Sequence, residues 1–343
     1  MKDAEQLAGR PGTVPVVSVV LPVYNGGATV ADTIESVLQQ TLPRFELIVI
    51  NDGSTDHTLD IVGNLSDSRV TVYSFENKGL AVSRNRGIRR AGAELVAFID
   101  ADDLWSADKL ERQVEALQTN PEAGWAYSWT DMIDEHNRFL NHGHHVHYEG
   151  EVFKNLLVSD FLDNGSNPTV RKSVFEHVGF FDESLTAAED WDMWLRIAYD
   201  YPLVCVPAVQ IFYRVHGSAM SSSIERQEAE CKKVVSKALN RMEPSAEKDK
   251  LIRDGKRHLY HYLAARVAQT QKGLAGGRMA IGYLRNFWNC TPSRLRDLPQ
   301  VSVLSIKIAI VSLLPESVSK VVLRCILTLR GRNRIVSIAD LQR

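Results

Sequence analysis

The sequence predicts an α/β fold, with a mostly parallel sheet flanked by helices and a C-terminal helical extension. Two observations support this prediction. Over the first hundred residues, apolar runs typical of buried strands alternate with segments of helical periodicity. Polar sequences follow three of these apolar runs, at 22–25, 51–54 and 100–102. Because ligands bind at the carboxyl ends of strands in open α/β sheets, the three sequences are expected to share one pocket.

The expected elements follow in chain order. Strands are predicted at 16–21, 45–50, 70–75 and 95–99, where apolar residues are continuous. Helices are predicted over 30–38, after the cap candidate Thr29, and over 56–65 and 80–91. Residues 151–222 are expected to complete the same domain with mixed helices and short strands, and 224–288 are predicted to be helical.

The composition is that of an ordinary globular protein. The 343 residues are 44% apolar and 24% charged, with a net charge of -2, and no nucleic-acid partner is expected. The four cysteines are far apart and form no CxxC pair, which argues against a disulfide framework or a zinc site and fits a reducing compartment. Since residues 1–12 lack the apolar core of a signal peptide, a cytoplasmic location is expected.

Four regions are predicted along the chain: a polar tail over 1–14, the α/β domain over 15–222, the helical extension over 223–290 and a basic amphipathic segment over 291–343. The last region holds nine Lys or Arg residues and three Asp or Glu residues. Apolar residues between 318 and 329 share one helical face, as in helices that lie on a membrane surface. Peripheral contact with the inner face of the cytoplasmic membrane through 301–334 and packing against the main domain are both open interpretations.

The acidic sequence Asp100-Ala101-Asp102-Asp103 directly follows the strand predicted at 95–99. Carboxylates at the end of a buried strand are costly unless a cation compensates their charge, which suggests a metal ion with a phosphate bound to it. The alternative is a turn in which Asp102 or Asp103 caps the next helix. Taken alone, this sequence is compatible with both interpretations.

Candidate ligand-binding residues also follow the second and third predicted strands. Asp52 precedes Gly53, which permits a tight turn and the close approach of a ligand. The Asp52 carboxylate is suited to accept hydrogen bonds from a nucleobase or a ribose, and the alternative is a cap for the helix that starts near Thr55. Lys78 and Arg84 lie early in the next helical segment, where a helix N-terminus and nearby cations favour an anion.

Together these motifs resemble the family-2 inverting glycosyltransferases of the GT-A fold. The resemblance covers residues 15–222 and rests on four ordered segments, 21–62, 77–103, 187–198 and 212–221, which contain LPVYNGG, VINDGS, NKGL, FIDADD, AAEDWD and FYRVH. It implies a nucleoside-diphosphate sugar as donor and a hydroxyl of a glycan or lipid-linked saccharide as acceptor.

The resemblance also implies roles for the residues on the donor side. Pro22, Val23 and Tyr24 would line the nucleobase pocket, and Asp52 would bind the base or the ribose. Asp100, Ala101 and Asp102 would form the family's DxD motif. Asp100 would serve the ribose side and Asp102 would be the more direct ligand of an Mg²⁺ or Mn²⁺ ion, which leaves Asp103 as a cap. Either ion prefers hard oxygen ligands and neutralises charge on a departing diphosphate.

Glu189 and Asp190 match the family's acidic pair on the acceptor side. An inverting displacement needs a base, and Asp190 would be that general base, while Glu189 would orient the acceptor or support the loop. The alternative is that both favour the N-terminus of the helix predicted over 191–199 through its dipole. Trp191 is a candidate for acceptor contact or else a core residue. His216 is a candidate member of the metal shell or else packs its own loop.

His142, His144, His145 and His147 form the densest histidine cluster of the chain. No acidic or cysteine partner has suitable spacing nearby, so no metal is expected at this cluster.

The leading hypothesis is therefore a metal-dependent inverting glycosyltransferase. The alternative is a catalytically silent nucleotide-sugar-binding or scaffold subunit, although the intact set Asp52, Asp100, Asp102 and Asp190 weighs against it. A nucleotidyltransferase would need a basic glycine-rich loop after the first strand, and residues 22–27 include no basic side chain. The sugar, the acceptor, the linkage and the oligomeric state stay open.

Overall fold

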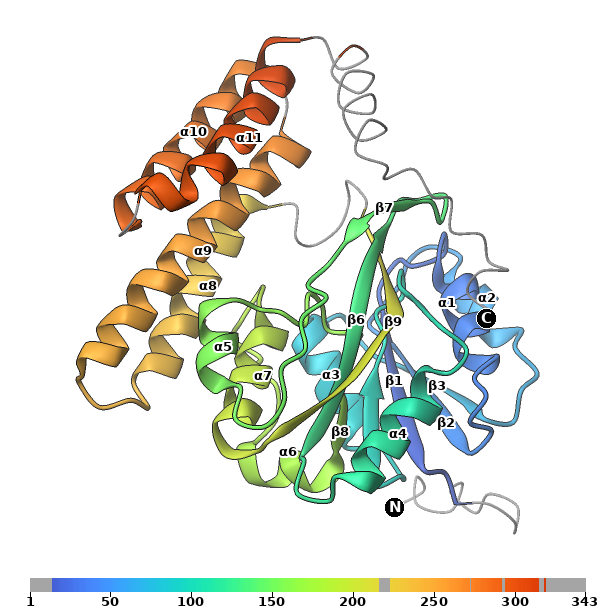
Figure 1. Cartoon of the computed structure of the whole chain (residues 1–343). Helices are drawn as coiled ribbons and strands as arrows, with labels where there is room; N and C mark the ends of the chain where they lie inside the picture. Colours follow the sequence, from blue (N-terminus) through green and yellow to red (C-terminus); the bar gives the residue numbers. More distant parts are fainter. Residues whose placement is uncertain (1–13, 216–222, 272, 292–293, 315–317, 319–343) are drawn as a thin grey trace.

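The computed structural model describes residues 14–215, 223–271, 273–291, 294–314 and 318. In this part of the chain a nine-stranded sheet packs between helices, and a group of longer helices extends from it (Figure 1). The strand order is β3-β2-β1-β4-β8-β6-β9-β5, with β7 paired to β6. The α/β fold class is confirmed.

The first half of the sheet has the predicted parallel arrangement. Its strands are β1 (Val17–Val23), β2 (Phe45–Asn51), β3 (Val70–Ser74) and β4 (Leu95–Phe98), and all neighbouring pairs among them are parallel. The helices between them are α1 (Val30–Leu38), α2 (Thr58–Gly63) and α3 (Leu80–Ile88). All seven elements overlap the predicted segments, and α2 is shorter than the helix expected over 56–65.

The second half of the sheet is mixed. It contains β5 (Leu104–Trp105), β6 (Trp125–Ile133), β7 (Phe139–His142), β8 (Thr169–Arg171) and β9 (Leu203–Arg214), with helices α4 (Lys109–Thr119), α5 (Phe153–Val158), α6 (Lys172–Val178) and α7 (Glu189–Asp200). Strand β8 is antiparallel to both β4 and β6, and β6 is parallel to β9. Strands β6 and β9 therefore run in the same direction as β1, and their carboxyl ends lie at the same edge of the sheet.

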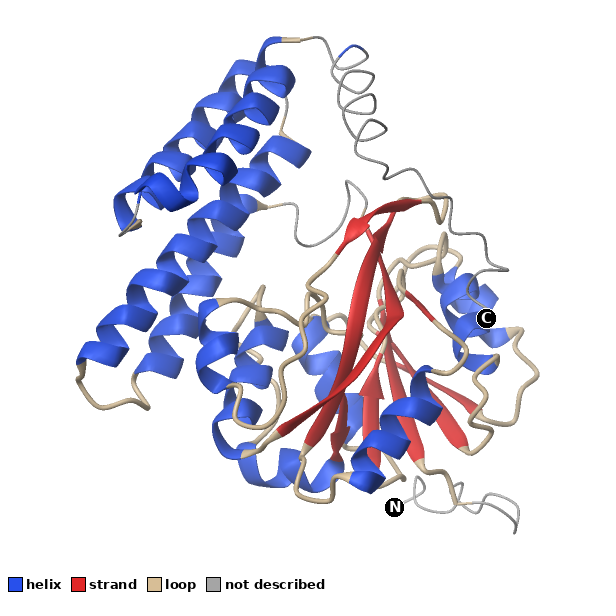
Figure 2. Ribbon diagram, viewed as in Figure 1, coloured by secondary structure: helices blue, strands red, loops and turns tan. Residues whose placement is uncertain are grey.

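The hydrophobic core occupies both faces of the sheet, as the uninterrupted apolar strands require. Alternate residues of β1 divide between two clusters, with Val19 and Leu21 on one face and Val20 on the other. Helices α1 and α4 cover the first face, and α3, α5, α6 and α7 cover the second (Figure 2). Because the strands are packed on both faces, their ends are held in place, and the polar loops that follow them start from fixed positions.

The helical extension consists of α8 (Ile224–Leu239), α9 (Ala246–Thr270), α10 (Gly273–Cys290) and α11 (Arg294–Leu313). Helix α8 contributes Cys231 and Val234 to the core of the α/β domain, so the extension is anchored there. A separate apolar cluster joins α9, α10 and α11, including Leu263, Phe287 and Ile308. In the described ranges, no helix has both the length and the apolar character that spanning a bilayer requires.

Two sequence-based predictions need correction. Neither Asp102 nor Asp103 caps a helix, because β5 follows the acidic sequence and α4 begins later, with Asp108 at its N-cap position. Thr29 occupies the N-cap position of α1 as predicted, but its hydroxyl donates to the carbonyl oxygen of Ala101 at 2.8 Å instead of capping the helix. This bond ties the start of α1 to the acidic sequence.

The predicted membrane contact over 301–334 falls only partly on described residues. Within α11, Leu304 and Ile308 are buried against α9 and α10, whereas Val303, Ile306 and Leu313 are exposed. Of this segment, 315–317 and 319–334 lie outside the described residues.

Candidate active site

The loops at the carboxyl ends of β1 and β2 are joined to each other. In the parallel pairing of β1 and β2, Val23 lies beside Asn51, so the segments that follow the two strands start side by side. The Asn25 amide N–H donates to Ser54 Oγ at 2.9 Å, and the Thr55 amide donates to Asn25 Oδ1 at 2.8 Å. Pro22 and Val23 are buried at this edge, and Tyr24 is 54% exposed beyond it. The first two predicted loops therefore form one edge of a shared site.

The Asp52 carboxylate organises the loop that follows β3. It is 3% exposed and accepts the backbone N–H groups of Lys78 at 3.1 Å and Gly79 at 2.7 Å. Arg86 Nη1 also donates to Asp52 Oδ1 at 2.8 Å. Asp52 is not a helix cap, since Asp56 accepts the Thr58 N–H at the start of α2. The Lys78 side chain is exposed, and Asp52 fixes its backbone at the entrance of α3.

Arg84 connects the acidic sequence after β4 to the acidic pair of α7. Its guanidinium is 1% exposed, and Nη2 donates to Asp100 Oδ1 at 2.7 Å while Nη1 donates to Glu189 Oε1 at 2.8 Å. Gly165 makes room for it, because a Cβ atom at that position would lie 2.2 Å from Arg84 Nη2. The charge of Arg84 is thus shared between two carboxylates, and its part in binding an anion stays a prediction.

The charges in this group perturb one another strongly. Burial raises the pKa of Glu189, the charge of Asp190 raises it further, and Arg84 only partly offsets both, so that the pKa is about 7. Burial also raises the pKa of Asp100 despite Arg84, with added repulsion from Asp102 and Asp190. Burial alone would lower the pKa of Arg84, but attraction to Asp100, Glu189 and Asp190 raises it. The site therefore carries more negative charge than Arg84 compensates.

Asp103 anchors two other segments to the acidic sequence. Its fully buried carboxylate accepts the Ser166 hydroxyl at 2.5 Å and the backbone N–H of Arg214 at 3.0 Å. Ser166 Oγ in turn accepts the Asp100 N–H at 2.9 Å, and Arg214 Nε donates to the carbonyl oxygen of Asp102 at 2.7 Å. Burial raises the pKa of Asp103, and the charges of Asp102 and Asp100 add to that shift. Sequence reasoning missed Ser166 and Arg214 in this role.

The acidic pair starts α7 from a strained position. Ala188, immediately before it, has φ 56° in the left-handed region, which non-glycine residues rarely adopt and which recurs at functional sites. Asp190 is half-buried, and its Oδ1 accepts the Trp191 N–H at 2.8 Å. Trp191 is 8% exposed and donates its indole N–H to the carbonyl oxygen of Leu156 at 2.9 Å. The Trp191 ring therefore lies in the core, which was the alternative to acceptor contact.

Asp160 is a further carboxyl group near the site that sequence reasoning did not select. Its pKa is raised well above the ordinary value by burial first, and then by the charges of Asp190 and Asp163. It lies in the connection between α5 and β8, a segment without a recognisable motif. Because the charge of Asp190 contributes to the raised pKa of Asp160, Asp160 is a neighbour of the acidic pair.

The family model described as "Glycosyltransferase like family 2" matches residues 18–267. The chain belongs to this glycosyltransferase family. The match includes both acidic motifs and extends beyond the α/β domain into α9. His216, the predicted member of the metal shell, lies outside the described residues.

Relatives and solved structures agree with this family membership. Over 119 residues the chain is 44% identical to the "Putative teichuronic acid biosynthesis glycosyltransferase TuaG" of Bacillus subtilis, a match of 34% of this chain and 46% of that protein. It is 27% identical over 255 residues to an uncharacterized glycosyltransferase of Rickettsia bellii, covering 72% of this chain and 36% of the relative. The chain thus spans less than half the length of these two relatives.

The fold is that of glycosyltransferases of known structure. S. aureus TarS in complex with UDP-GlcNAc has a TM-score of 0.61 at 19% identity, covering 85% of this chain and 88% of that chain. The mannosyltransferase PcManGT of Pyrobaculum calidifontis, in complex with GDP-Man and Mn²⁺, has a TM-score of 0.54 at 19% identity and covers 88% of each chain. The predicted GT-A fold is confirmed.

Proposed function

We propose that the chain transfers a sugar from a nucleoside-diphosphate donor to a hydroxyl group, with inversion at the anomeric carbon. The observation that carries the proposal is the position of Arg84, whose Nη2 binds Asp100 while its Nη1 binds Glu189. Through this bridge, the acidic sequence after β4 and the acidic pair of α7 form one site. A glycosyl transfer needs both parts, one for the departing diphosphate and one for the attacking hydroxyl.

The nucleoside side of the donor is assigned to the edge formed by the first two loops. Pro22 and Val23 end β1 there, and Tyr24 and Asp52 directly follow β1 and β2. In this proposal the base and ribose lie against these residues, and the exposed Lys78 side chain faces the anionic diphosphate. The hydrogen bonds from Lys78, Gly79 and Arg86 to Asp52 hold this edge in shape before the donor binds.

The donor set fits a hard divalent cation. Asp100 and Asp102 supply carboxylate oxygens, and burial and mutual repulsion raise the pKa of Asp100, so a nearby cation would relieve that repulsion. We assign Mg²⁺ or Mn²⁺ to these two residues, with Asp102 as the more direct ligand. When bound, the ion neutralises negative charge on the diphosphate leaving group. The Mn²⁺ in the complex of PcManGT agrees with this assignment.

Asp190 is the general base of the proposed reaction. Its carboxylate takes the proton of the acceptor hydroxyl as that oxygen forms a bond to the anomeric carbon and the bond to the diphosphate oxygen breaks. Glu189 supports the loop rather than touching the acceptor, because its carboxyl group is buried and bound to Arg84. Asp160 is a further buried carboxyl group beside this base, and the charge of Asp190 contributes to the raised pKa of Asp160.

For the acceptor we propose a growing glycan or a lipid-linked saccharide at the cytoplasmic face of the membrane. The name of the relative TuaG refers to teichuronic acid biosynthesis, which agrees with a role in glycan assembly. The exposed apolar residues of α11, among them Val303, Ile306 and Leu313, are consistent with peripheral contact to such a surface.

A panel of nucleotides tests the donor assignment. We expect one of UDP, GDP, dTDP or CMP, or its sugar conjugate, to raise the midpoint of thermal unfolding with Mn²⁺, since a ligand that binds only the folded state stabilises it. The Asp102→Asn variant should lose the Mn²⁺-dependent part of the shift while keeping its metal-free melting behaviour. If no nucleotide stabilises the chain, or the shift is the same without Mn²⁺, the donor or metal assignment is wrong.

A further inference from the structure

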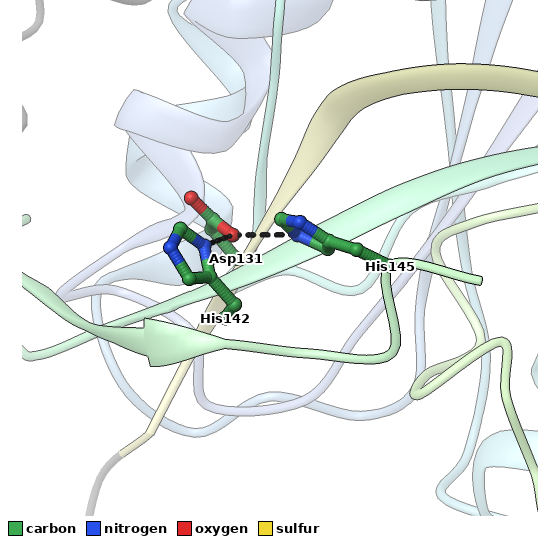
Figure 3. A group of neighbouring side chains, drawn as sticks. All are labelled: Asp131, His142 and His145. Atoms are coloured by element: carbon green, nitrogen blue, oxygen red, sulfur yellow. Dashed lines mark hydrogen bonds and ion pairs between the residues drawn. The ribbon is translucent and has the colours of Figure 1, made fainter.

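Two histidines and one aspartate meet outside the site described above. Asp131 lies on β6, His142 ends β7, and His145 follows in the connection to α5. His142 Nδ1 is 2.8 Å from Asp131 Oδ1, and His145 Nε2 is 2.9 Å from the same oxygen. Figure 3 shows both imidazoles turned toward that carboxylate. The three ligand atoms lie within 4.8 Å of one another.

The sequence analysis expected no metal at the histidines of 142–147, because no acidic residue near them in the sequence has suitable spacing. Strand pairing supplies the partner instead. Asp131 lies directly opposite His142 in the antiparallel register of β6 and β7, eleven residues earlier in the chain. Residues opposite each other on adjacent strands have neighbouring side chains, so the hairpin brings the carboxylate to the imidazole.

We propose that Asp131, His142 and His145 bind a divalent transition-metal ion, with Zn²⁺ as the preferred ion. Two imidazole nitrogens and one carboxylate oxygen form a donor set suited to zinc, whereas Mg²⁺ and Ca²⁺ prefer oxygen ligands alone. Three protein ligands leave a fourth tetrahedral position for water or another oxygen ligand. The His142 side chain is 56% exposed, so an ion can enter from solvent.

The charge balance of the cluster also favours a cation. The Asp131 side chain is 11% exposed, and the ion pairs found for it in the described part of the chain are both to imidazoles. A buried carboxylate is costly unless a cation compensates its charge, and no lysine or arginine is among these partners. A bound ion would supply the missing positive charge.

The scaffold around the ligands is already in place. The His145 ring stacks on Trp129, with 5.0 Å between ring centroids and 11° between planes. Trp129 Nε1 and the Tyr127 hydroxyl both donate to the carbonyl oxygen of Val146, at 2.8 and 2.9 Å, which fixes the segment next to His145. Ligands that lie on strands or pack against aromatic rings lose little further freedom when they bind an ion.

The cluster lies at the same edge of the sheet as the candidate active site. Asp131 pairs with Phe212 of β9, and Phe212 pairs with Leu104 of β5, the residue after the acidic sequence. With strands about 4.8 Å apart, the backbone of Asp131 is about 10 Å across the sheet from that residue. An ion here would therefore hold the segment from β7 to α5 beside the site without sharing its carboxylates.

Zinc binding by the full chain tests the proposal. Protein freed of metal with a chelator is titrated with Zn²⁺ against a chromophoric indicator, in excess Mg²⁺, which cannot compete for imidazole ligands. We expect one tight equivalent for the wild type. His142→Ala and His145→Ala should each weaken binding more than about 10-fold, because loss of an outer-shell partner alone costs 10- to 100-fold. With Co²⁺ as a coloured substitute for Zn²⁺, the visible absorption of the bound ion should also be weaker in these two variants than in the wild type.

The matched control is His147→Ala, since His147 lies in the same segment, pairs with Glu149 at 3.2 Å and has the same 56% side-chain exposure as His142. This variant should bind Zn²⁺ within about twofold of the wild type, and far-UV circular dichroism without metal should be the same for all variants. The proposal is overturned if the wild type binds no Zn²⁺ at micromolar concentration, or if His142→Ala binds as tightly as His147→Ala. Because His142 is half exposed, its replacement leaves the fold intact.

Discussion

Replacing Arg84 with methionine should destabilise the α/β domain strongly. The substitution keeps a long side chain against Phe181 but removes the only cation that touches both Asp100 and Glu189 in the described residues. The Glu189 side chain is 6% exposed and the Asp100 side chain 22%, so water replaces little of what the guanidinium supplied. Removing one partner of a buried ion pair costs about 3–5 kcal/mol.

The cost should depend on pH. In the variant both carboxyl groups have lost the cation that lowered their pKa values, so they take up protons more readily. For each group, every pH unit from the raised pKa down to the ordinary value restores up to about 1.4 kcal/mol of unfolding free energy. The difference in unfolding free energy between wild type and Arg84→Met should therefore be largest at pH 8 and smaller at pH 5, as measured by denaturant titration.

Arg89→Met is the matched control for this experiment. Arg89 lies one turn further along the same helical segment, is exposed and has its guanidinium over the Phe180 ring at 4.8 Å. Its loss should cost less than about 1 kcal/mol. If Arg84→Met costs no more than Arg89→Met at pH 8, the guanidinium does not stabilise the fold by joining the two acidic motifs.

Two further predictions concern the same group. In Glu189→Gln the pH dependence should change, because folded Glu189 keeps its proton up to a pKa of about 7 while the unfolded residue loses it near 4.5. The wild type should therefore lose about 3 kcal/mol relative to Glu189→Gln as pH rises from 4.5 to 7, and parallel stability curves would contradict this. Gly165→Ala places a Cβ atom 2.2 Å from Arg84 Nη2 and should cost about 1–3 kcal/mol in unfolding titrations. That cost should shrink in the Arg84→Met background, and an equal cost in both backgrounds would show that Arg84 is not what the methyl group displaces.

The strands of the first half of the sheet could be predicted because their signal is local. Each is a continuous apolar run, and both of its faces are buried, so residues such as Val19 and Val20 must both be apolar. The acidic sequence was recognised for the same reason, since it interrupts such a run abruptly. The role of Asp103 was not, because a carboxylate that binds Ser166 and the Arg214 backbone looks like a helix cap in sequence.

The links between motifs could not be predicted, because they depend on residues far apart in the chain. Arg84 and Glu189 are 105 positions apart, and the early position of Arg84 in its helical segment indicates an anion site but not a pairing with two distant carboxylates. Arg86 binds Asp52 but was not among the candidate site residues predicted from the sequence. The pairing of Asp131 with His142 depends on the register of a hairpin, which the spacing of the histidines does not reveal.

The proposed base can be tested most directly by comparing sugar transfer and donor binding in Asp190→Asn. Asp200→Asn is the control, because Asp200 ends the same helix, is exposed and is 3.9 Å from Arg241 in a weak ion pair. We predict that Asp190→Asn slows transfer by about 10²- to 10⁴-fold while its donor affinity stays close to that of the wild type and of Asp200→Asn. Transfer by Asp190→Asn at the wild-type rate would contradict the assignment of the base, and a wild type that binds the donor without releasing nucleotide would contradict glycosyl transfer itself.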